Sequence, residues 1–245
     1  MIAIRGGPRL YVSAPHACSY LPDRMAGTLF IDPRFPLTHE LLGELNGRGF
    51  RRSGDVIYRP HCPDCRACVP VRIPVESFVA SRAQRRALAR NGDLAVNARA
   101  AAFEAEHYAL FRRYQNARHP GGSMADPDPP TYMRFLAGRH GHTIFYEFRM
   151  ARALACVAVV DALPDGLSAV YTFFDPALTQ RGLGTYAIVW QIAEARRRGL
   201  PFLYLGYWVE GSRKMAYKAR FKPLEAYRGG HWSPLGIDEA ARRRD

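Results

Sequence analysis

A strand, a glycine turn and a helix follow one another in the last third of the chain, and this order constrains the fold most. Residues 168–175 have the composition of a strand, and the apolar run 186–193 has that of a helix. The segment between them reads Gln180, Arg181, Gly182, Leu183, Gly184 and Thr185. Glycines let backbone N–H groups approach an anion, and a helix N-terminus adds partial positive charge. The pattern favours a phosphate-bearing donor beside an open strand edge, although an ordinary strand-to-helix turn would have the same local sequence.

Further strand-like runs surround this turn. Residues 143–150, 153–161 and 167–175 precede it, and residues 202–208 follow the helix and are apolar on both faces, as in a central strand. This order resembles the GNAT N-acyltransferase core, in which two adjacent parallel strands splay apart after the glycine turn. We therefore expect an α/β (α+β) protein whose residues 99–238 form a GNAT-like core with a mixed, splayed sheet.

The first part of the chain has a different character. Residues 1–98 contain four of the five cysteines and are expected to form a small module of short elements. Thr38 predicts one helix start, and Ser81 with Gln84 predicts another through a capping box. Residues 239–245 are expected to be a basic tail.

The charge balance points to an anionic partner. Of the 245 residues, 35 are Lys or Arg and 22 are Asp or Glu, which gives a net charge of +13. Such a field favours RNA or acidic substrates. No apolar run approaches the roughly 20 residues of a membrane span, and the N-terminus lacks the core of a signal peptide. We expect a cytoplasmic protein without a membrane partner.

A series of segments from about residue 14 to residue 235 is much more specific than the topology. They are CSYLP at 18–22, GFRRSG at 49–54, YRPHC at 58–62, CRACVPVR at 65–72, SRAQRR at 81–86, EHY at 106–108, YTFFDP at 171–176, GLGTYA at 182–187, YLGYW at 204–208 and KMAYK at 214–218. Together they resemble the bacterial aspartate/glutamate leucyltransferase branch of the aminoacyl-tRNA–protein transferase family.

This resemblance implies that leucine moves from leucyl-tRNA to the α-amine of proteins that begin with Asp or Glu, which enter degradation through the N-degron pathway. A coenzyme A-dependent GNAT N-acetyltransferase would share the turn and the splayed strands but would not explain the cysteine module. A non-catalytic RNA-binding regulator would explain the charge and the cysteines but would leave the acyltransferase-like core without a purpose.

An aminoacyl ester is already activated, so the enzyme must mainly orient an amine, support the oxyanion and help to remove a proton. Asp175, at the end of its strand, is the first candidate for orienting the amine or accepting its proton, and a turn cap is the alternative. Glu147 could be a buried base or form an ion pair with Arg149.

The residues expected to bind the donor lie in three places: the glycine turn, the cationic side of a helix after residue 213, and a basic helix that could track the tRNA backbone. They are Gln180, Arg181, Gly182, Gly184, Thr185, Lys214, Tyr217, Lys218, Arg82, Arg85 and Arg86. A solvated basic face is the alternative for both helices.

The acidic residue of the acceptor needs guanidinium groups, which pair with carboxylates in a bidentate fork. Arg51, Arg52 and Arg59 with Tyr58 are the expected set. The arginines near residue 85 are the rival set, and the sequence does not separate the two assignments.

Two of the cysteine pairs have metal-ligand spacing. Cys62 and Cys65, and likewise Cys65 and Cys68, are separated by two residues, and Cys18 could supply a fourth ligand. Zinc or an iron–sulfur cluster is a possible cofactor, although the transfer itself requires none, and buried reduced thiols are the alternative. Cys156 lies among apolar residues and is expected in the core.

Overall fold

An eight-stranded mixed sheet forms the centre of the computed structural model, which describes residues 8–122, 124, 126–140 and 142–236. Its strand order is β14-β13-β7-β12-β11-β10-β9-β8. The members of this sheet are β7 (Cys68–Pro74), β8 (Leu94–Ala100), β9 (Thr143–Met150), β10 (Ala153–Leu163), β11 (Gly166–Phe174), β12 (Phe202–Val209), β13 (Glu225–Arg228) and β14 (His231–Pro234). Only β11 and β12 pair in parallel, so the mixed α/β fold predicted from the sequence is confirmed.

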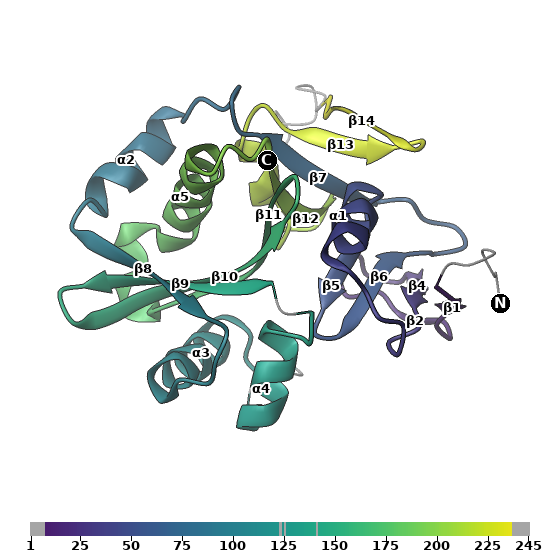
Figure 1. Ribbon diagram of the computed structural model, residues 1–245, viewed down its shortest axis with the longest axis horizontal. Coiled ribbons are helices and arrows are strands. Elements are labelled where there is room, and N and C mark those ends of the chain that lie inside the picture. The colour runs from purple at the N-terminus through teal and green to yellow at the C-terminus, as the bar shows by residue number, and fades with distance from the viewer. Residues whose placement is uncertain (1–7, 123, 125, 141, 237–245) are drawn as a thin grey trace.

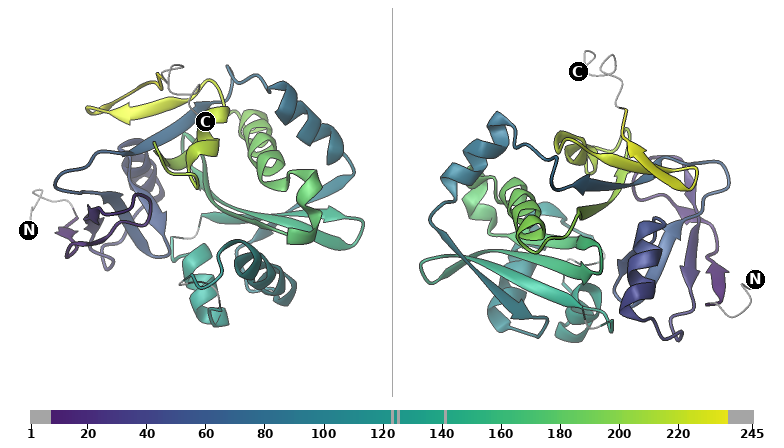
Figure 2. Two further views of the ribbon diagram at one scale, coloured as in Figure 1. Left: turned by 180° about the vertical axis from the view of Figure 1, so that it is seen from behind. Right: turned by 45° about the horizontal axis from the view of Figure 1, so that its top comes forward.

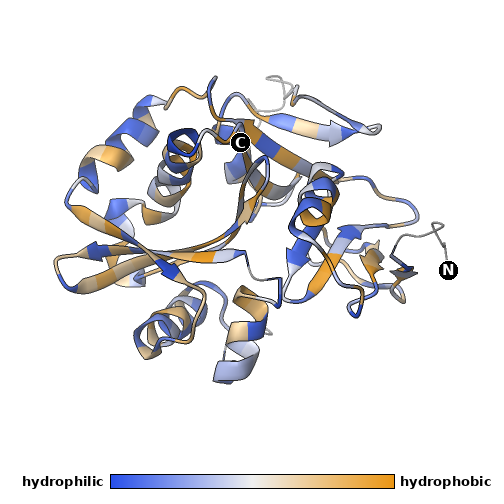
Figure 3. Cartoon of the chain, viewed as in Figure 1, coloured by the Kyte–Doolittle hydropathy of each residue, from blue (hydrophilic) through white to orange (hydrophobic). Residues whose placement is uncertain are grey.

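Helices cover both faces of this sheet (Figure 1). On one face lie α2 (Arg82–Arg90) and α5 (Leu183–Arg197), and on the other lie α3 (Ala105–Arg118) and α4 (Pro129–Leu136). Two 3₁₀ helices, η1 (Pro176–Arg181) and η2 (Ala216–Arg220), flank α5 and β12 along the chain. Figure 3 shows why the layers associate, because apolar strands lie between helices whose outward sides are hydrophilic.

A smaller sheet lies beside the large one, and both views of Figure 2 show it at the N-terminal side of the molecule. Its strand order is β1-β4-β6-β5, and α1 (His39–Gly47) packs with it around a separate apolar cluster. Its strands are β1 (Leu10–Val12), β4 (Thr28–Ile31), β5 (Arg51–Ser53) and β6 (Val56–Pro60), and a two-stranded ribbon of β2 (His16–Ala17) and β3 (Met25–Ala26) precedes β4.

Local sequence signals set several helix boundaries. The Thr38 side chain caps α1, and both bonds of the Ser81–Gln84 capping box begin α2. Gly199 follows α5 with φ of +69°, a conformation that favours glycine. Cys156 is fully buried, as predicted. Strand β8, which pairs with β9 as the edge strand of the large sheet, was not predicted from the sequence.

The N-terminal part contributes directly to the large sheet. Strand β7 lies between β12 and β13 and pairs with both. The division of the chain at residues 98 and 99 stays a prediction, and the basic tail at 239–245 lies outside the described residues. In the described part, no helix is long and apolar enough to cross a membrane.

Candidate active site at a strand fork

Strands β11 and β12 diverge soon after they meet. Their pairing covers only three residue pairs, which end at Ser168 opposite Tyr204, although both strands continue for several residues. Beyond this point each strand presents a backbone edge without the other as its partner. This strand fork is the splayed parallel pair that the sequence predicted.

The glycine turn lies next to the end of β11. Gly182 adopts φ of +65°, which a side chain would strain, and α5 begins directly after it. A Cβ on Gly184 would contact the Phe174 ring at 3.5 Å. The helix N-terminus therefore lies over the last aromatic residue of β11, and Gln180 is exposed beside it.

Part of the predicted anion cradle is already occupied. The N–H of Gly182 donates to Thr179, and the N–H of Thr185 donates to the Gly182 carbonyl at 3.1 Å. The Arg181 guanidinium forms a bidentate pair with Asp93 at 2.8 and 2.9 Å. These contacts correct the expectation that Gly182, Thr185 and Arg181 all face a phosphate, because the two N–H groups bond within the turn and the Arg181 guanidinium is paired with Asp93. Gly184 is the predicted donor whose position still suits a ligand.

Asp175 caps the turn that follows β11, which was the alternative to a role with the amine. Its Oδ1 accepts from the N–H of Ala177 at 2.9 Å, and its other oxygen lies 3.5 Å from Arg113. Its side chain is 28% exposed, so the carboxylate is still partly accessible to solvent. A role for Asp175 in orienting the amine stays a proposal.

Glu147 lies beneath α3, in a network of ion pairs. Its carboxylate bonds the His107 ring at 2.8 Å and the Arg149 guanidinium at 2.9 Å. Burial raises the pKa of Glu147, but the hydrogen bonds from Arg149 and His107 outweigh it and bring the pKa to about 2. Such a carboxylate is a poor proton acceptor at neutral pH. The ion pair with Arg149, the alternative interpretation, is present, and the base interpretation has no support in this geometry.

The four predicted acceptor residues do not act as a set. Arg52 is 3% exposed and pairs with Asp161 through two bonds at 2.7 and 2.8 Å. Arg51 is buried, donates to Asn46 and lies over the Tyr204 and Tyr207 rings. These contacts make Arg51 and Arg52 structural, which corrects the prediction.

Arg59 lies apart from these two arginines, in the wall of a pocket of about 610 Å³. Its guanidinium stacks on Phe50 with 5.0 Å to the ring centroid. The Tyr58 ring packs near the Tyr207 ring, and the Tyr207 hydroxyl donates a hydrogen bond to the backbone carbonyl of Tyr58. Arg59 is therefore the member of the predicted set that a ligand in the pocket could reach.

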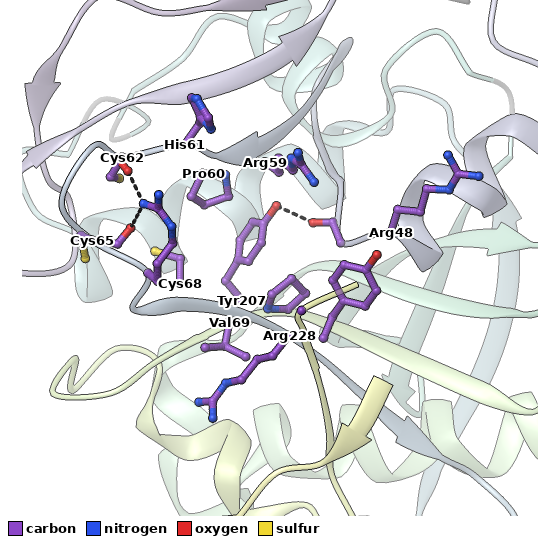
Figure 4. Close-up of a pocket in the computed structure, with 15 residues that line it drawn as sticks. Arg48, Arg59, Pro60, His61, Cys62, Cys65, Cys68, Val69, Tyr207 and Arg228 are labelled. Atoms are coloured by element: carbon purple, nitrogen blue, oxygen red, sulfur yellow. Dashed lines mark hydrogen bonds between the residues drawn. The ribbon is translucent and has the colours of Figure 1, made fainter. Parts of the chain in front are cut away.

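Three other arginines join Arg59 in the lining of this pocket, which Figure 4 shows with the cysteine loop at one end and Arg48 at the other. These additional residues are Arg48, Arg66 and Arg228. Among the residues that the structure describes, no aspartate or glutamate lines the pocket. We call it the arginine pocket. The sequence could not single out Arg48 and Arg228, because Arg48 directly follows α1 and Arg228 ends β13, far apart in the chain.

The cysteine loop forms part of the same wall. Cys62, Cys65 and Cys68 line the arginine pocket, and the Cys18 sulfur accepts from the N–H of Tyr20 at 3.5 Å. Burial and the other three thiols raise the pKa of Cys68 to about 11, so its thiol stays protonated at neutral pH. Within the described ranges, no group of three or more His, Cys, Asp or Glu side chains is arranged to hold a metal ion. The cysteines as placed do not fit a cluster, and binding of zinc or an iron–sulfur cluster stays a prediction.

The short helix η2 does not present one cationic side. Lys214 precedes it and is exposed, and Tyr217 is 41% exposed, whereas Lys218 is buried at 6% exposure. Lys218 instead donates from Nζ to the Tyr207 carbonyl at 2.6 Å. This correction removes Lys218 from the surface that could contact tRNA phosphates.

An aromatic and cationic cluster surrounds the end of β11 and was missed in the sequence. Tyr114 packs edge-on against Phe174 at 4.9 Å, and Arg118 lies over the same ring at 5.6 Å. Burial lowers the pKa of His119, and the nearby Lys214 and Arg118 lower it further. Residues from α3, β11 and the segment before η2 thus meet beside the glycine turn. The helical spacing of apolar residues predicted Tyr114 on an apolar face of α3, but it could not predict the contact with Phe174.

The basic side of helix α2 is exposed to solvent, which was the alternative to a contact with tRNA. Arg82, Arg85 and Arg86 are all exposed, while Gln84 and Ala87 are buried, and the Gln84 side chain donates to the Arg220 carbonyl. An exposed row of guanidinium groups is compatible with a nucleic-acid backbone.

Two family models match the chain. The one described as "Arginine-tRNA-protein transferase, N terminus" matches residues 16–86, and the one described as "Arginine-tRNA-protein transferase, C terminus" matches residues 106–228. Aspartate/glutamate leucyltransferases of Pseudomonas putida W619 and Pseudomonas aeruginosa LESB58 are each 48% identical over 227 residues, which cover 93% of this chain and 97% of theirs. Among solved structures, L-PGS from Bacillus licheniformis aligns with a TM-score of 0.48 and 11% identity, over 68% of this chain and 62% of that one.

Proposed function

Since the chain belongs to the aminoacyl-tRNA–protein transferase family and is a transferase, we propose that it moves leucine from leucyl-tRNA to the amino group of proteins that begin with Asp or Glu. The product carries an N-terminal leucine and is marked for degradation through the N-degron pathway. The identity of 48% to leucyltransferases over nearly their whole length supports leucine rather than arginine as the transferred residue.

The arginine pocket carries the acceptor side of this proposal. Four arginines line it, and no aspartate or glutamate among the described residues does, so its lining has an excess of positive charge. Guanidinium groups bind carboxylates through two parallel N–H···O bonds. An acidic N-terminal side chain fits this charge, whereas its amide counterpart gains far less from it. Arg59, held on Phe50, is the anchor we assign to the acceptor carboxylate.

The aromatic cluster and the glycine turn carry the donor side. The terminal base of a tRNA can stack on exposed rings, and cations beside it can pair with phosphates. Tyr217 and Lys214 are exposed here, and the Gly184 backbone lies directly over Phe174. The proposed donor therefore enters between the N-terminus of α5 and the segment before η2.

The exposed arginines of α2 are a second contact for the donor. Helix α2 packs beside α5, the helix that begins at the glycine turn (Figure 1). A tRNA bound at the turn could therefore extend over the exposed side of α2. We assign Arg82, Arg85 and Arg86 to the phosphate backbone of the tRNA rather than to the acceptor, because they are remote from the lining of the arginine pocket.

A transfer assay with paired acceptors tests this function. Labelled leucyl-tRNA, arginyl-tRNA or acetyl-coenzyme A is supplied with peptides that begin with Asp, Asn, Glu or Gln. We expect label to move only from leucyl-tRNA and only to the Asp and Glu peptides. The Asn and Gln peptides match the acidic ones in shape, so the difference isolates the carboxylate charge.

The other outcomes contradict the proposal in distinct ways. Transfer from acetyl-coenzyme A would support a coenzyme A-dependent N-acetyltransferase. Binding of leucyl-tRNA without transfer to any peptide would support a non-catalytic RNA-binding regulator. Equal transfer to Asp and Asn peptides would refute the assignment of the arginine pocket.

A further inference from the structure

The arginine pocket has more room and more positive charge than a single acidic side chain needs. Its volume of about 610 Å³ falls within the range of pockets that enclose a whole ligand, roughly 300–1,000 Å³. One carboxylate is satisfied by one guanidinium group, which binds it through two parallel N–H···O bonds, whereas four arginines line this pocket. The lining can therefore hold more of an acceptor than its first side chain.

The four arginines differ in how firmly the fold holds them. Arg59 is half-buried and stacks on Phe50. Arg66 is exposed, but its Nη1 donates to the Cys65 carbonyl at 2.9 Å and so helps to close the cysteine loop. Arg48 and Arg228 are exposed, and neither forms an ion pair with a carboxylate of the described residues. We call Arg48 and Arg228 the outer arginines.

A close contact between α1 and β13 brings the outer arginines to the same part of the pocket. Gly49, which follows Arg48, adopts φ of +83°, and a Cβ there would lie 3.2 Å from the Tyr227 ring. Arg228 follows Tyr227 at the end of β13. The end of α1 and the end of β13 thus pack against each other, and each carries an unpaired guanidinium group next to the contact.

Arg59 belongs to the other side of the same turn. The Tyr207 hydroxyl donates to the Gly49 carbonyl at 2.9 Å and to the Tyr58 carbonyl at 3.2 Å, so it ties the turn to the strand that carries Arg59. Figure 4 shows Arg48, Arg59 and Arg228 on different sides of the cavity. The rest of an acceptor protein must lead from the pocket to solvent. If its first carboxylate pairs with half-buried Arg59, its next residues pass the exposed outer arginines.

We propose, on the basis of the function proposed above, that the outer arginines bind a second acidic side chain at position two or three of the acceptor. An extended peptide advances about 3.3 Å per residue, so both positions lie within a few ångströms of the first. The preferred substrates are then proteins with an acidic N-terminal segment, rather than all proteins that begin with Asp or Glu.

Matched peptide pairs test the proposal with the full-length protein and saturating leucyl-tRNA. One pair begins with Asp-Asp and Asp-Asn, and the other with Asp-Ala-Asp and Asp-Ala-Asn. The second acid in at least one pair should lower KM about 2- to 5-fold, the effect of an exposed ion pair, and leave kcat unchanged because it lies away from the reacting atoms. The ratio of the two KM values should shrink as the salt concentration rises. Both peptides use the same donor, so the effect of salt on tRNA binding cancels in this ratio.

Substitutions of the outer arginines locate the effect. Arg48→Gln and Arg228→Gln should each reduce the advantage of the second acid. Arg9→Gln removes the same charge at an exposed position outside the pocket lining, and it should keep the advantage. Arg228→Glu should favour a peptide that begins with Asp-Lys over one that begins with Asp-Asp. A merely structural role of Arg228 would impair all peptides alike and would not invert the preference.

The unfavourable outcomes separate this proposal from the function on which it rests. Equal KM values within both pairs, with Asp still preferred over Asn at position one, would overturn the second-acid proposal and leave the proposed function intact. Absence of transfer to every Asp peptide would refute the proposed function itself. If the glutamine variants weaken leucyl-tRNA binding and leave the peptide ratios unchanged, the outer arginines contact the tRNA, and the proposal is wrong.

Discussion

Arg52 and Arg59 lie on neighbouring strands of one hairpin, and the structure predicts opposite consequences of replacing each by methionine. Methionine keeps much of the aliphatic stem and removes the charge. Arg52→Met leaves the Asp161 carboxylate buried without its ionic partner, since both side chains are less than a tenth exposed. Breaking a buried ion pair in this way costs about 3–5 kcal/mol. For a chain of this size that corresponds to a fall in Tm of about 6–20 °C.

Arg59→Met should instead leave the Tm nearly unchanged and impair the use of acidic acceptors. Arg59 is half-buried in the wall of the arginine pocket, and no carboxylate pairs with it among the described residues. A hydrogen bond to a charged group contributes about 1.5–3 kcal/mol, which corresponds to a loss of roughly 10- to 150-fold in kcat/KM for an Asp peptide.

Two assays together decide between these effects. Thermal unfolding measures the first, and transfer of leucine to Asp and Asn peptides measures the second. Arg59→Met should reduce the preference for Asp over Asn, whereas folded Arg52→Met should keep it. If Arg59→Met unfolds as readily as Arg52→Met, or if its preference for Asp is unchanged, the assignment of the acceptor carboxylate to Arg59 is wrong.

Three further predictions follow from the other parts of the site. The pKa of Glu147 is lowered from 4.5 to about 2, so its ionisation contributes at most about 3 kcal/mol to the free energy of unfolding. This contribution should be complete above pH about 4.5 and disappear as the pH falls toward 2. In acid unfolding, the free energy of unfolding of Glu147→Gln should therefore depend less steeply on pH in this window. Gly184→Arg should abolish transfer but leave the Tm within a few degrees, because a Cβ there meets only the Phe174 ring at 3.5 Å; normal turnover would contradict the donor position. Replacing the exposed α2 arginines by glutamine should weaken leucyl-tRNA binding and reduce the salt dependence of log K by roughly 0.7–0.9 for each lost phosphate contact, and an unchanged slope would exclude α2 from the interface; the positions are Arg82, Arg85 and Arg86.

Several features of the fold could be predicted because they depend on local chemistry. The capping box at Ser81 and Gln84 and the cap at Thr38 each satisfy helix donors with a neighbouring side chain, so a short window of sequence contains the whole interaction. The order of strands around the glycine turn likewise predicted a mixed sheet with a splayed parallel pair, and that pair is present.

The roles of individual arginines could not be predicted in this way. Arg51, Arg52 and Arg59 stand within nine residues of one another and look alike in the sequence. Their partners come from distant segments: Asp161 from β10 for Arg52, and Tyr204 and Tyr207 from β12 for Arg51. Since a guanidinium group is free for a ligand only when no such partner engages it, its function depends on contacts that the hairpin alone does not contain.

The sequence by itself determined the family, the basic character and the positions of most helices and strands, because these depend on ordered motifs, summed charge and local periodicity. Only the tertiary structure decided which charges remain available. Gly206, with φ of +76°, lies at a register shift in β12 that places Tyr204 and Tyr207 on the same side, against Arg51. The same strand then leaves the Tyr207 carbonyl to Lys218. Burial and pairing are properties of segments brought together by folding, and they turn identical arginine side chains into a structural ion pair or a binding group.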